Sequence, residues 1–463
     1  MHTLKIIIRK ALNSICRLIA NAGIISPFIF LFSRLINERK STIKNTDHKF
    51  TVFALNENRF RGDLQILADN GIKVLSLSVE WQRRILEIFW SEELKVEIEK
   101  DPIKYYVPNN DYLFTHIQKK LRIFLSKLLP ALFEKLNIDC VIGAAVHYLQ
   151  DYDIGKISSQ IGVPYIVLHK ENLVASEVIR DTLTKYYMQV GPFVGDAIIV
   201  HNEMMRDVFI KSGFAQPKKI TALGCMRMDS FVKKVKDSKN SSRNKERKLV
   251  TLFSFNHITG ISKVESTNSG EKYFNDFTSN RDFGWVNLFE KSHASIAKLA
   301  IQNPDIDFII KPKWGDLWID EIEYAFKKYN IDLSKINNLK IIYDIDIHKL
   351  ILETDVCIGF NSSVLLESAI ASKPMIIPFF DEAIDPKYNR FTFFQNELDL
   401  FDVAKNSDQL ESLIIKRLKN PLIDSETEEK RNALFEKYLS SMNADASLKY
   451  ISKIESIINI KKN

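Results

Sequence analysis

The sequence predicts an α/β protein of two domains, each built on a parallel β-sheet. Its 463 residues are more than one ordinary hydrophobic core holds together. Short apolar runs alternate with helical patterns from residue 50 to residue 378, which is typical of parallel sheets covered by helices on both faces. The stretch 232–248 is rich in lysine and arginine and interrupts this alternation, as a solvated linker does. We therefore expect the domain boundary there.

Composition narrows the classes of function. Hydrophobic residues make up 45% and charged residues 27% of the chain, as in globular proteins. The net charge of +7 suits an anionic substrate or a membrane surface, and it is too diffuse to indicate a nucleic-acid partner. The 4 cysteines form no CxxC pair, so we expect buried thiols in a reducing compartment and no zinc site. No GxG occurs, which excludes a dinucleotide fingerprint, and there is no P-loop.

Residues 1–40 combine basic and apolar side chains. The uncharged run 18–33 is short for a membrane-spanning helix, and no cleavage site of small residues follows it convincingly. We predict that this segment lies in a membrane interface. The alternative is a pair of helices packed on the protein. The cations of the segment are Lys5, Arg9, Lys10, Arg17, Arg34, Arg39 and Lys40.

An N-terminal domain is predicted over residues 41–231. Its expected strands are 50–55, 72–78, 139–145, 163–168, 196–200 and 220–223. Its expected helices are 62–70, 152–160 and 204–212, with a mainly helical stretch over 80–135. Strands that alternate with helices in this way pair in parallel.

A second α/β series is predicted over residues 249–400. Its expected strands are 249–255, 307–311, 339–342, 355–360 and one that begins at residue 375. Its expected helices are 285–303, 319–329 and 348–353. The tail 401–463 is predicted to be helical, with one helix crossing back to the first domain.

The stretch 355–378, DVCIGFNSSVLLESAIASKPMIIP, predicts a strand, a tight turn, a buried helix and a further strand. Asn361, Ser362 and Ser363 are residue types that cap a helix start. Free N–H groups and the helix dipole make such a start suitable for a phosphate. Glu367 lies one turn deeper on the same face, where it could accept hydrogen bonds from a ribose. The alternative is an ordinary βα unit in which the serines only cap the helix.

Several segments in a fixed order resemble the GT-B glycosyltransferase superfamily. These segments are IGVPYIVLHKEN, GDAIIVHNEMMRDVFIKSGF, KKITALGCMRMD, LVTLFSFNH, DFIIKPK and DIDIHKLILETDVCIGFNSSVLLESAIASKPMIIP. More narrowly, the chain is similar to CDP-glycerol glycerophosphotransferase-like and surface-carbohydrate biosynthesis transferases, over residues 139–380. The resemblance implies two Rossmann-like domains that face an interdomain cleft. The N-terminal domain would then bind the acceptor and the C-terminal domain the nucleotide donor.

The resemblance also assigns residues to the donor. The hydroxyl-bearing turn of the family matches Asn361, Ser362 and Ser363, and its "KP" at a strand end matches Lys311 and Pro312. The family often has a histidine after that proline, and Lys313 stands here instead. The "G-x-x-R-x-D" element of the family matches Gly224, Arg227 and Asp229.

Placement at strand ends agrees with this assignment. Ligands of open α/β sheets bind beyond the carboxyl ends of the strands, where Lys311, His257, Asn361 and His169 are predicted to lie. Lys311 and Arg227 are expected to neutralise a diphosphate leaving group. The alternatives are an exposed strand-end lysine for Lys311 and a salt bridge with Asp229 for Arg227.

The acceptor hydroxyl needs a general base within hydrogen-bond reach. Glu171 and His169 are the candidates, and His147 and His201 are weaker ones. The alternatives are a packed structural histidine and a glutamate in a solvated loop. The pair Asp344 and Asp346 imitates a metal-binding DxD motif, but Asp346 is better explained as a helix cap. We therefore predict no bound metal.

These observations favour an enzyme that transfers a sugar or polyol-phosphate unit to a surface glycan, free or lipid-linked. A nucleotide-activated donor would be its substrate, and no further cofactor is expected. The expected location is cytoplasmic, peripheral at the inner face of the cell membrane. One alternative is an isomerase of the UDP-sugar 2-epimerase type, although the N-terminal acidic signature of that family is absent. Another is an assembly subunit that binds nucleotide sugars without turnover.

Overall fold

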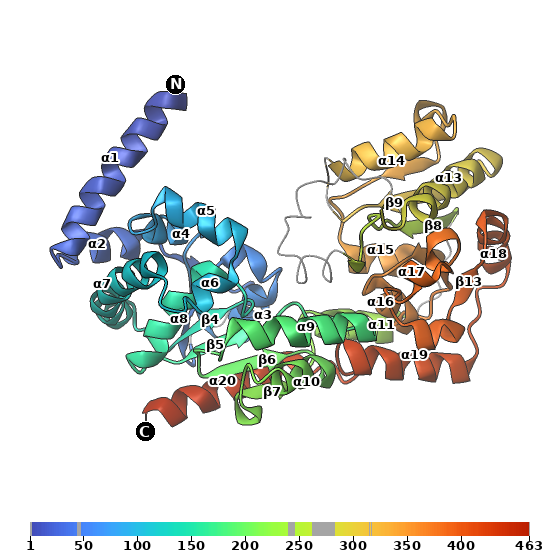
Figure 1. Cartoon of the computed structure of the whole chain (residues 1–463). Coiled ribbons are helices and arrows are strands. Elements are labelled where there is room, and N and C mark those ends of the chain that lie inside the picture. Colours follow the sequence, from blue (N-terminus) through green and yellow to red (C-terminus); the bar gives the residue numbers. More distant parts are fainter. Residues whose placement is uncertain are drawn as a thin grey trace. The chain divides into compact units, whose positions relative to one another are not determined.

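The computed structural model describes residues 2–43, 48–238, 246–261, 283–313, 315 and 317–462, with side chains from residue 12 onward. The chain divides into two compact units (Figure 1). Unit 1 comprises Met1–Asn172, Thr184–Asp229 and Asp445–Asn463. Unit 2 comprises Leu173–Leu183 and Ser230–Ala444.

Unit 1 contains a seven-stranded sheet in the order β1-β3-β2-β4-β5-β6-β7. Neighbouring strands pair in parallel, except that β1 pairs with β3 in antiparallel fashion. The strands are β1 (Asn37–Arg39), β2 (Thr51–Ala54), β3 (Lys73–Ser76), β4 (Cys140–Gly143), β5 (Tyr165–Leu168), β6 (Ala197–Val200) and β7 (Ile220–Ala222). The strand order reverses between β2 and β4.

Helices cover both faces of this sheet, because its strands are apolar on both sides. Phe53 and Leu55 face a core formed with helices α2, α4, α7 and α8, whereas Val52 and Ala54 face a core formed with α3 and α20. The helices of unit 1 are α1 (His2–Asn21), α2 (Ser26–Leu35), α3 (Asp63–Asp69), α4 (Val79–Glu87), α5 (Glu92–Lys100), α6 (Ile103–Tyr106), α7 (Tyr112–Leu136), α8 (Leu149–Gln160), α10 (Glu203–Lys211) and α20 (Ala446–Lys462), together with the last residues of α9 (Glu177–Val190). Such burial explains the continuous apolar runs in the sequence.

Unit 2 contains a six-stranded parallel sheet in the order β10-β9-β8-β11-β12-β13. Its strands are β8 (Lys248–Phe253), β9 (Ile306–Lys311), β10 (Leu339–Ile341), β11 (Val356–Gly359), β12 (Met375–Pro378) and β13 (Asp402–Ala404). Its helices are α11 (Met228–Ser238), α13 (Val286–Gln302), α14 (Leu317–Lys328), α15 (Ile347–Glu353), α16 (Val364–Ile370), α17 (Pro386–Asn389), α18 (Ser407–Lys419) and α19 (Ser425–Tyr438). The chain runs outward from β8 to β10, returns to the other side of β8 and continues to β13. The order therefore reverses between β8 and β11, as in Rossmann-type sheets.

The predicted fold class is confirmed: two Rossmann-like parallel sheets, with helical segments at both ends of the chain. Several boundaries differ, and residues 173–183 of the predicted N-terminal domain belong to unit 2. Residues 37–39, expected in a membrane segment, form the edge strand β1. Residues 228–238, expected to be linker in part, form α11, and residues 239–245 of that linker lie outside the described residues. The C-terminal tail is shared, because α18 and α19 belong to unit 2 and α20 to unit 1.

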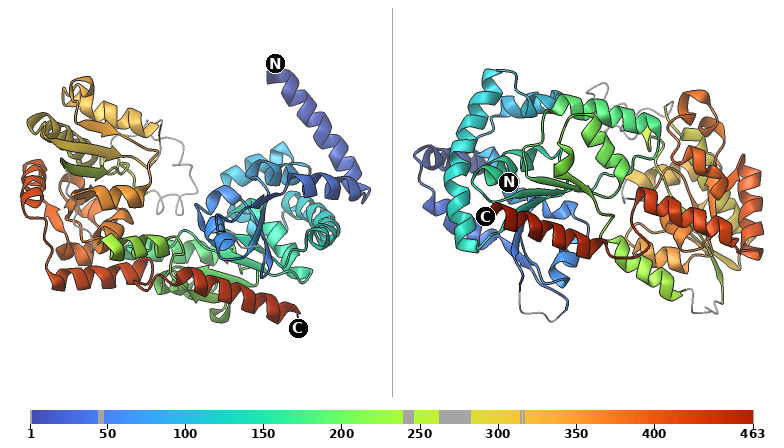
Figure 2. Two further views of the ribbon diagram at one scale, coloured as in Figure 1. Left: turned by 180° about the vertical axis from the view of Figure 1, so that it is seen from behind. Right: turned by 90° about the horizontal axis from the view of Figure 1, so that it is seen from below.

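Helix α20 completes the core of unit 1 and lies beside its sheet in both views of Figure 2. Asp229 fixes the start of this helix, because its carboxylate accepts hydrogen bonds from the N–H groups of Ala446 (3.1 Å) and Ser447 (2.7 Å). Tyr450 donates a hydrogen bond of 2.9 Å to the carbonyl of Gly224. The structure therefore gives Asp229 a capping role.

Candidate functional site

The candidate site of unit 2 lies where the strand order reverses, at the carboxyl ends of β8, β9 and β11. The pairing registers place three residues in one row, since Gly359 pairs with Phe253 and Phe253 pairs with Lys311. The chain leaves the sheet just after each of these residues. Because ligands of open α/β sheets bind in such a crevice, the segments that follow these strands are the candidate binding groups.

The turn after β11 is held by the side chain of Asn361. This residue has a left-handed backbone (φ 47°) and is buried. Its amide nitrogen donates to the carbonyls of Thr259 (3.2 Å) and Phe391 (3.1 Å), and its amide oxygen accepts from the N–H of Phe393 (2.8 Å). The side chain therefore shapes the turn by binding the surrounding backbone.

The two serines of this turn act differently from simple helix caps. Ser363 occupies the cap position of α16 without a capping hydrogen bond from its side chain. Its hydroxyl instead donates to Oε1 of Glu367 at 2.9 Å. The Ser362 hydroxyl accepts from the N–H of Val364 at 3.3 Å. Glu367 is buried, and its Oε2 lies 3.3 Å from Nε2 of His348.

Lys311 ends β9 in the same row of the sheet. Its Nζ donates to the carbonyl of Pro312 at 2.7 Å, and the side chain is half-buried. Burial lowers the pKa of Lys311, and the negative charge of Asp344 opposes that shift. The cation is thus partly desolvated, which strengthens its attraction to an anion.

A serine–histidine pair follows β8. The hydroxyl of Ser254 lies 2.8 Å from Nε2 of His293, and Nδ1 of His293 lies 2.6 Å from the carbonyl of Phe289. Burial lowers the pKa of His293 to about 4, so the imidazole is neutral at pH 7. Its Nδ1–H then donates to the carbonyl, and its Nε2 accepts from the serine. His257, a predicted donor ligand, is buried, and its carbonyl accepts from the N–H of Trp285 (2.6 Å).

The predicted residues of unit 1 lie on the segments that follow β4, β5, β6 and β7. His169 is fully buried, with its ring 5.2 Å from that of Phe209 and 6.0 Å from that of His147. This packing is the environment of a structural histidine. Glu171 is exposed. Burial lowers the pKa of His201 well below its ordinary value, and the positive charge of Arg227 adds to this shift.

Two buried polar groups of unit 1 were not anticipated from the sequence. Lys170, between the two candidate bases, forms an ion pair with Asp63 and donates to the carbonyl of Phe60 at 2.7 Å. Asp151 of α8 accepts from the Gln82 side chain at 2.5 Å. Burial raises the pKa of Asp151 to about 7, although the hydrogen bond from Gln82 and the charge of Arg59 favour the ionised form. Both pairs join segments far apart in the chain, so no local pattern signals them.

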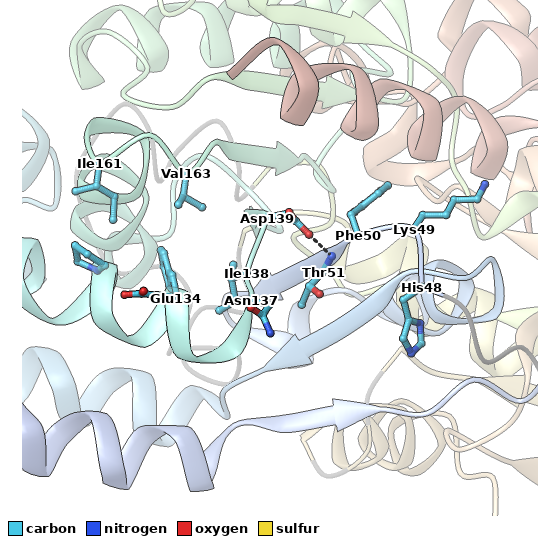
Figure 3. A pocket seen from close by; sticks show the side chains of 12 residues that line it. His48, Lys49, Phe50, Thr51, Glu134, Asn137, Ile138, Asp139, Ile161 and Val163 are labelled. Atoms are coloured by element: carbon cyan, nitrogen blue, oxygen red, sulfur yellow. Dashed lines mark hydrogen bonds between the residues drawn. The ribbon is translucent and has the colours of Figure 1, made fainter. Parts of the chain in front are cut away.

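A groove at the amino ends of the unit 1 strands has a volume of ≈ 560 Å³ (Figure 3). Residues that precede β2, β4 and β5 line it. Asp139 accepts from the N–H of Thr51 (2.8 Å) and is paired with Lys462 (2.6 Å). The amino ends of parallel strands are not where such sheets bind ligands. We therefore place the candidate site at the carboxyl edge.

The expected helix cap at Asp346 is confirmed, since its carboxylate accepts from the N–H of Lys349 at 3.0 Å. Within the described residues, no group of three or more histidine, cysteine, aspartate or glutamate side chains could hold a metal ion.

No family model matches the sequence, and no curated protein matches it significantly. Among solved structures, the chain is similar to UDP-GlcNAc 2-epimerase from Neisseria meningitidis bound to UDP-GlcNAc, with 10% identity over 88% of this chain and 99% of that chain and a TM-score of 0.45. It is also similar to α,α-trehalose-phosphate synthase (UDP-forming) from Burkholderia vietnamiensis, with 11% identity over 88% of this chain and 100% of that chain and a TM-score of 0.45. A glycosyltransferase from Rickettsia africae shows 12% identity over 89% of this chain and 99% of that chain, again with a TM-score of 0.45. Similarities this distant assign no reaction.

Proposed function

We propose that the protein is a metal-independent transferase of GT-B type. It moves a sugar or polyol-phosphate unit from a nucleotide-activated donor to a hydroxyl of a surface glycan. Unit 2 binds the donor at the carboxyl edge of its sheet, and unit 1 binds the acceptor. Lys311 faces the diphosphate together with the turn at Ser362 and Ser363, and Glu367 accepts hydrogen bonds from the ribose.

One observation supports this proposal above the others: the registered row of strand ends where the order of the unit 2 sheet reverses. That row brings a desolvated cation, Lys311, to the edge that also carries a hydroxyl-bearing turn and the buried carboxylate of Glu367. A diphosphate needs positive charge and hydrogen-bond donors, and a ribose diol needs an acceptor. The combination therefore fits a nucleoside diphosphate better than it fits a diphosphate or a ribose alone.

Replacing Lys311 by alanine is expected to weaken nucleoside-diphosphate binding by roughly tenfold or more, because a charge-assisted hydrogen bond contributes about 1.5–3 kcal/mol. Isothermal titration calorimetry with UDP, CDP, ADP and GDP measures this. Lys340→Ala is the matched control, since Lys340 is exposed on β10, the strand beside β9. The melting temperature should stay unchanged in both variants. Equal affinities in wild type and Lys311→Ala, or no binding of any of these nucleotides to wild type, would contradict the proposed donor site.

We also propose that the N-terminal helices dock on an anionic bilayer surface. None of the helices in the described part of the chain has the length and apolarity needed to cross a membrane. The α1 side chains Leu12, Ile15 and Leu18 form an exposed apolar stripe, at 55%, 53% and 71% exposure. The sequences of α1 and α2 also contain the basic residues Lys5, Arg9, Lys10 and Arg34, a combination that fits an interface of anionic lipid.

Truncation is a poor test of this docking, because Phe28 and Phe32 of α2 belong to the core of unit 1. The triple substitution Leu12→Gln, Ile15→Gln and Leu18→Gln keeps that core. It is expected to lower co-sedimentation with phosphatidylglycerol vesicles by more than about tenfold, through lost apolar burial. The control carries the same change at the exposed apolar residues Leu422, Leu448 and Ile460. Equal sedimentation of the triple variant and wild type would refute membrane docking by α1.

A further inference from the structure

The carboxylate of Glu367 is held from two sides by residues of different elements. Ser363, at the start of α16, donates to its Oε1 at 2.9 Å. His348, in the first turn of α15, places Nε2 3.3 Å from its Oε2. At this distance Nε2 of His348 faces Oε2 of Glu367 closely enough to form an ion pair when the nitrogen carries a proton.

The ring of His348 is itself fixed. It stacks on Phe231 of α11, with ring centroids 4.2 Å apart and ring planes 16° apart. Phe231 is fully buried and cannot move without disturbing the core. The ring plane of His348 and the position of its Nε2 are therefore determined before any ligand binds.

A buried carboxylate depends on such donors for its orientation. Glu367 is only 4% exposed, so bulk water replaces a removed partner poorly. Asp346, which caps α15, also acts electrostatically with His348.

We propose that His348 is a positioning residue that orients Glu367 to accept hydrogen bonds from the ribose diol of the donor. This proposal rests on the donor site assigned above and deepens it, because it names the part of the donor that the His348–Glu367 pair recognises. His348 acts through Glu367 and touches no reacting atom. Its contribution is preorganisation: the acceptor oxygens are set in place before the nucleotide arrives.

Two substitutions separate the two properties of the histidine. His348→Phe keeps a ring that can stack on Phe231 and removes the nitrogen that faces Glu367. His348→Gln keeps an N–H donor close to the position of Nε2 and removes the aromatic ring. Lys349→Ala is the control, because Lys349 is the next residue on α15. Its Nζ lies 4.0 Å from Oε1 of Glu353, which is a weak ion pair.

The readout is discrimination between ribose and dideoxyribose. Binding of UDP, CDP, ADP and GDP is compared with binding of their 2′,3′-dideoxy counterparts by titration calorimetry. His348→Phe is expected to weaken binding of the ribonucleotide by roughly tenfold. Its affinity for the dideoxynucleotide should stay within about twofold of the wild-type value. His348→Gln should restore most of the ribonucleotide affinity. Combined with Glu367→Gln, His348→Phe should have no additional effect, since both changes disable one unit.

Each result has a definite meaning. Wild-type discrimination in His348→Phe, or an equal loss for both nucleotide classes, would overturn the positioning role, because a merely structural histidine affects both classes alike. Additive effects in the double variant would also overturn it. The outcome is separable from that of the proposed function. If the wild-type protein binds nucleotides and Lys311→Ala weakens that binding, the proposed donor site is supported regardless of the result for His348.

Discussion

At pH 8 the Asp151→Asn variant is expected to be more stable than the wild-type protein, by as much as about 4 kcal/mol. Burial raises the pKa of the Asp151 carboxyl from its model-compound value of 3.8 to about 7 in the folded protein. The folded state therefore holds this proton more tightly than the unfolded state does. Its stabilising effect is complete below pH ~4 and is lost as the pH rises through 7. Each unit of pKa shift corresponds to about 1.4 kcal/mol.

Asparagine suits the site because it keeps the acceptor for Gln82, whose Nε2 donates to Oδ1 of Asp151. Among the described residues, Oδ2 of Asp151 has no hydrogen-bond partner. Replacing this oxygen by the amide nitrogen of asparagine therefore breaks no hydrogen bond. The other charged and titratable groups that act on Asp151 or feel its charge are Arg59, Tyr106, Tyr148 and Tyr165.

Urea denaturation from pH 4 to pH 8 measures the difference between the two proteins. The control is Asp153→Asn, two residues along α8, where the carboxylate accepts from Tyr105 (2.5 Å) and Arg122 (2.7 Å). That change should destabilise the protein across the whole range, because it removes an acceptor from paired donors. Parallel stability curves for wild type and Asp151→Asn would show that Asp151 does not titrate in this way.

Gly155→Ala is expected to destabilise unit 1 by about 3 kcal/mol or more, although alanine is the better helix former. A Cβ at Gly155 would lie 2.3 Å from the ring of Tyr165, and one at Gly195 would lie 2.8 Å from the same ring. The Tyr165 hydroxyl is 2.5 Å from where a Cβ of Gly143 would be. The ring thus packs against three glycines, and a methyl group at Gly155 must displace it.

Thermal unfolding of Gly155→Ala tests this. Gln160→Ala, at an exposed site at the end of the same helix, should leave the melting temperature nearly unchanged. Adding Tyr165→Leu to Gly155→Ala should recover part of the loss, because the smaller side chain leaves room for the methyl group. A melting temperature of Gly155→Ala equal to that of wild type would mean that the ring can shift at little cost.

The sequence predicted the strands of the two sheets well, because most of them are buried on both faces and therefore apolar throughout. β1 and β13 were missed. β1 reads Asn-Glu-Arg, is exposed along its whole length and exists only through pairing with β3, so its residues carry no strand pattern. Helix α11 was missed for a different reason. Its lysines resemble a linker, but Phe231, Val232 and Val235 are buried at helical spacing, a signal that the charge run obscured.

The candidate site was predicted in outline and not in its contacts. Lys311 and the turn after β11 do lie at the same edge of the sheet, on either side of β8, because alternating strands and helices bring carboxyl ends to one edge. The use of the Asn361 amide to bind backbone depends on Thr259 and Phe391, far away in the chain. The contact of His348 with Glu367 joins two helices and leaves no trace in local spacing. Long-range pairings of this kind require the folded structure.

Helix α20 has a consequence for how the protein is made. Ile451, Ile454 and Ile458 close one core of unit 1 against strands such as β2, which contributes Val52. A ribosome releases the strands of that sheet first and then all of residues 230–444 before these isoleucines emerge. Throughout that interval, one apolar face of the unit 1 sheet is without its final cover, a state prone to wrong association. Completion of the first unit therefore waits until the second unit has been synthesised.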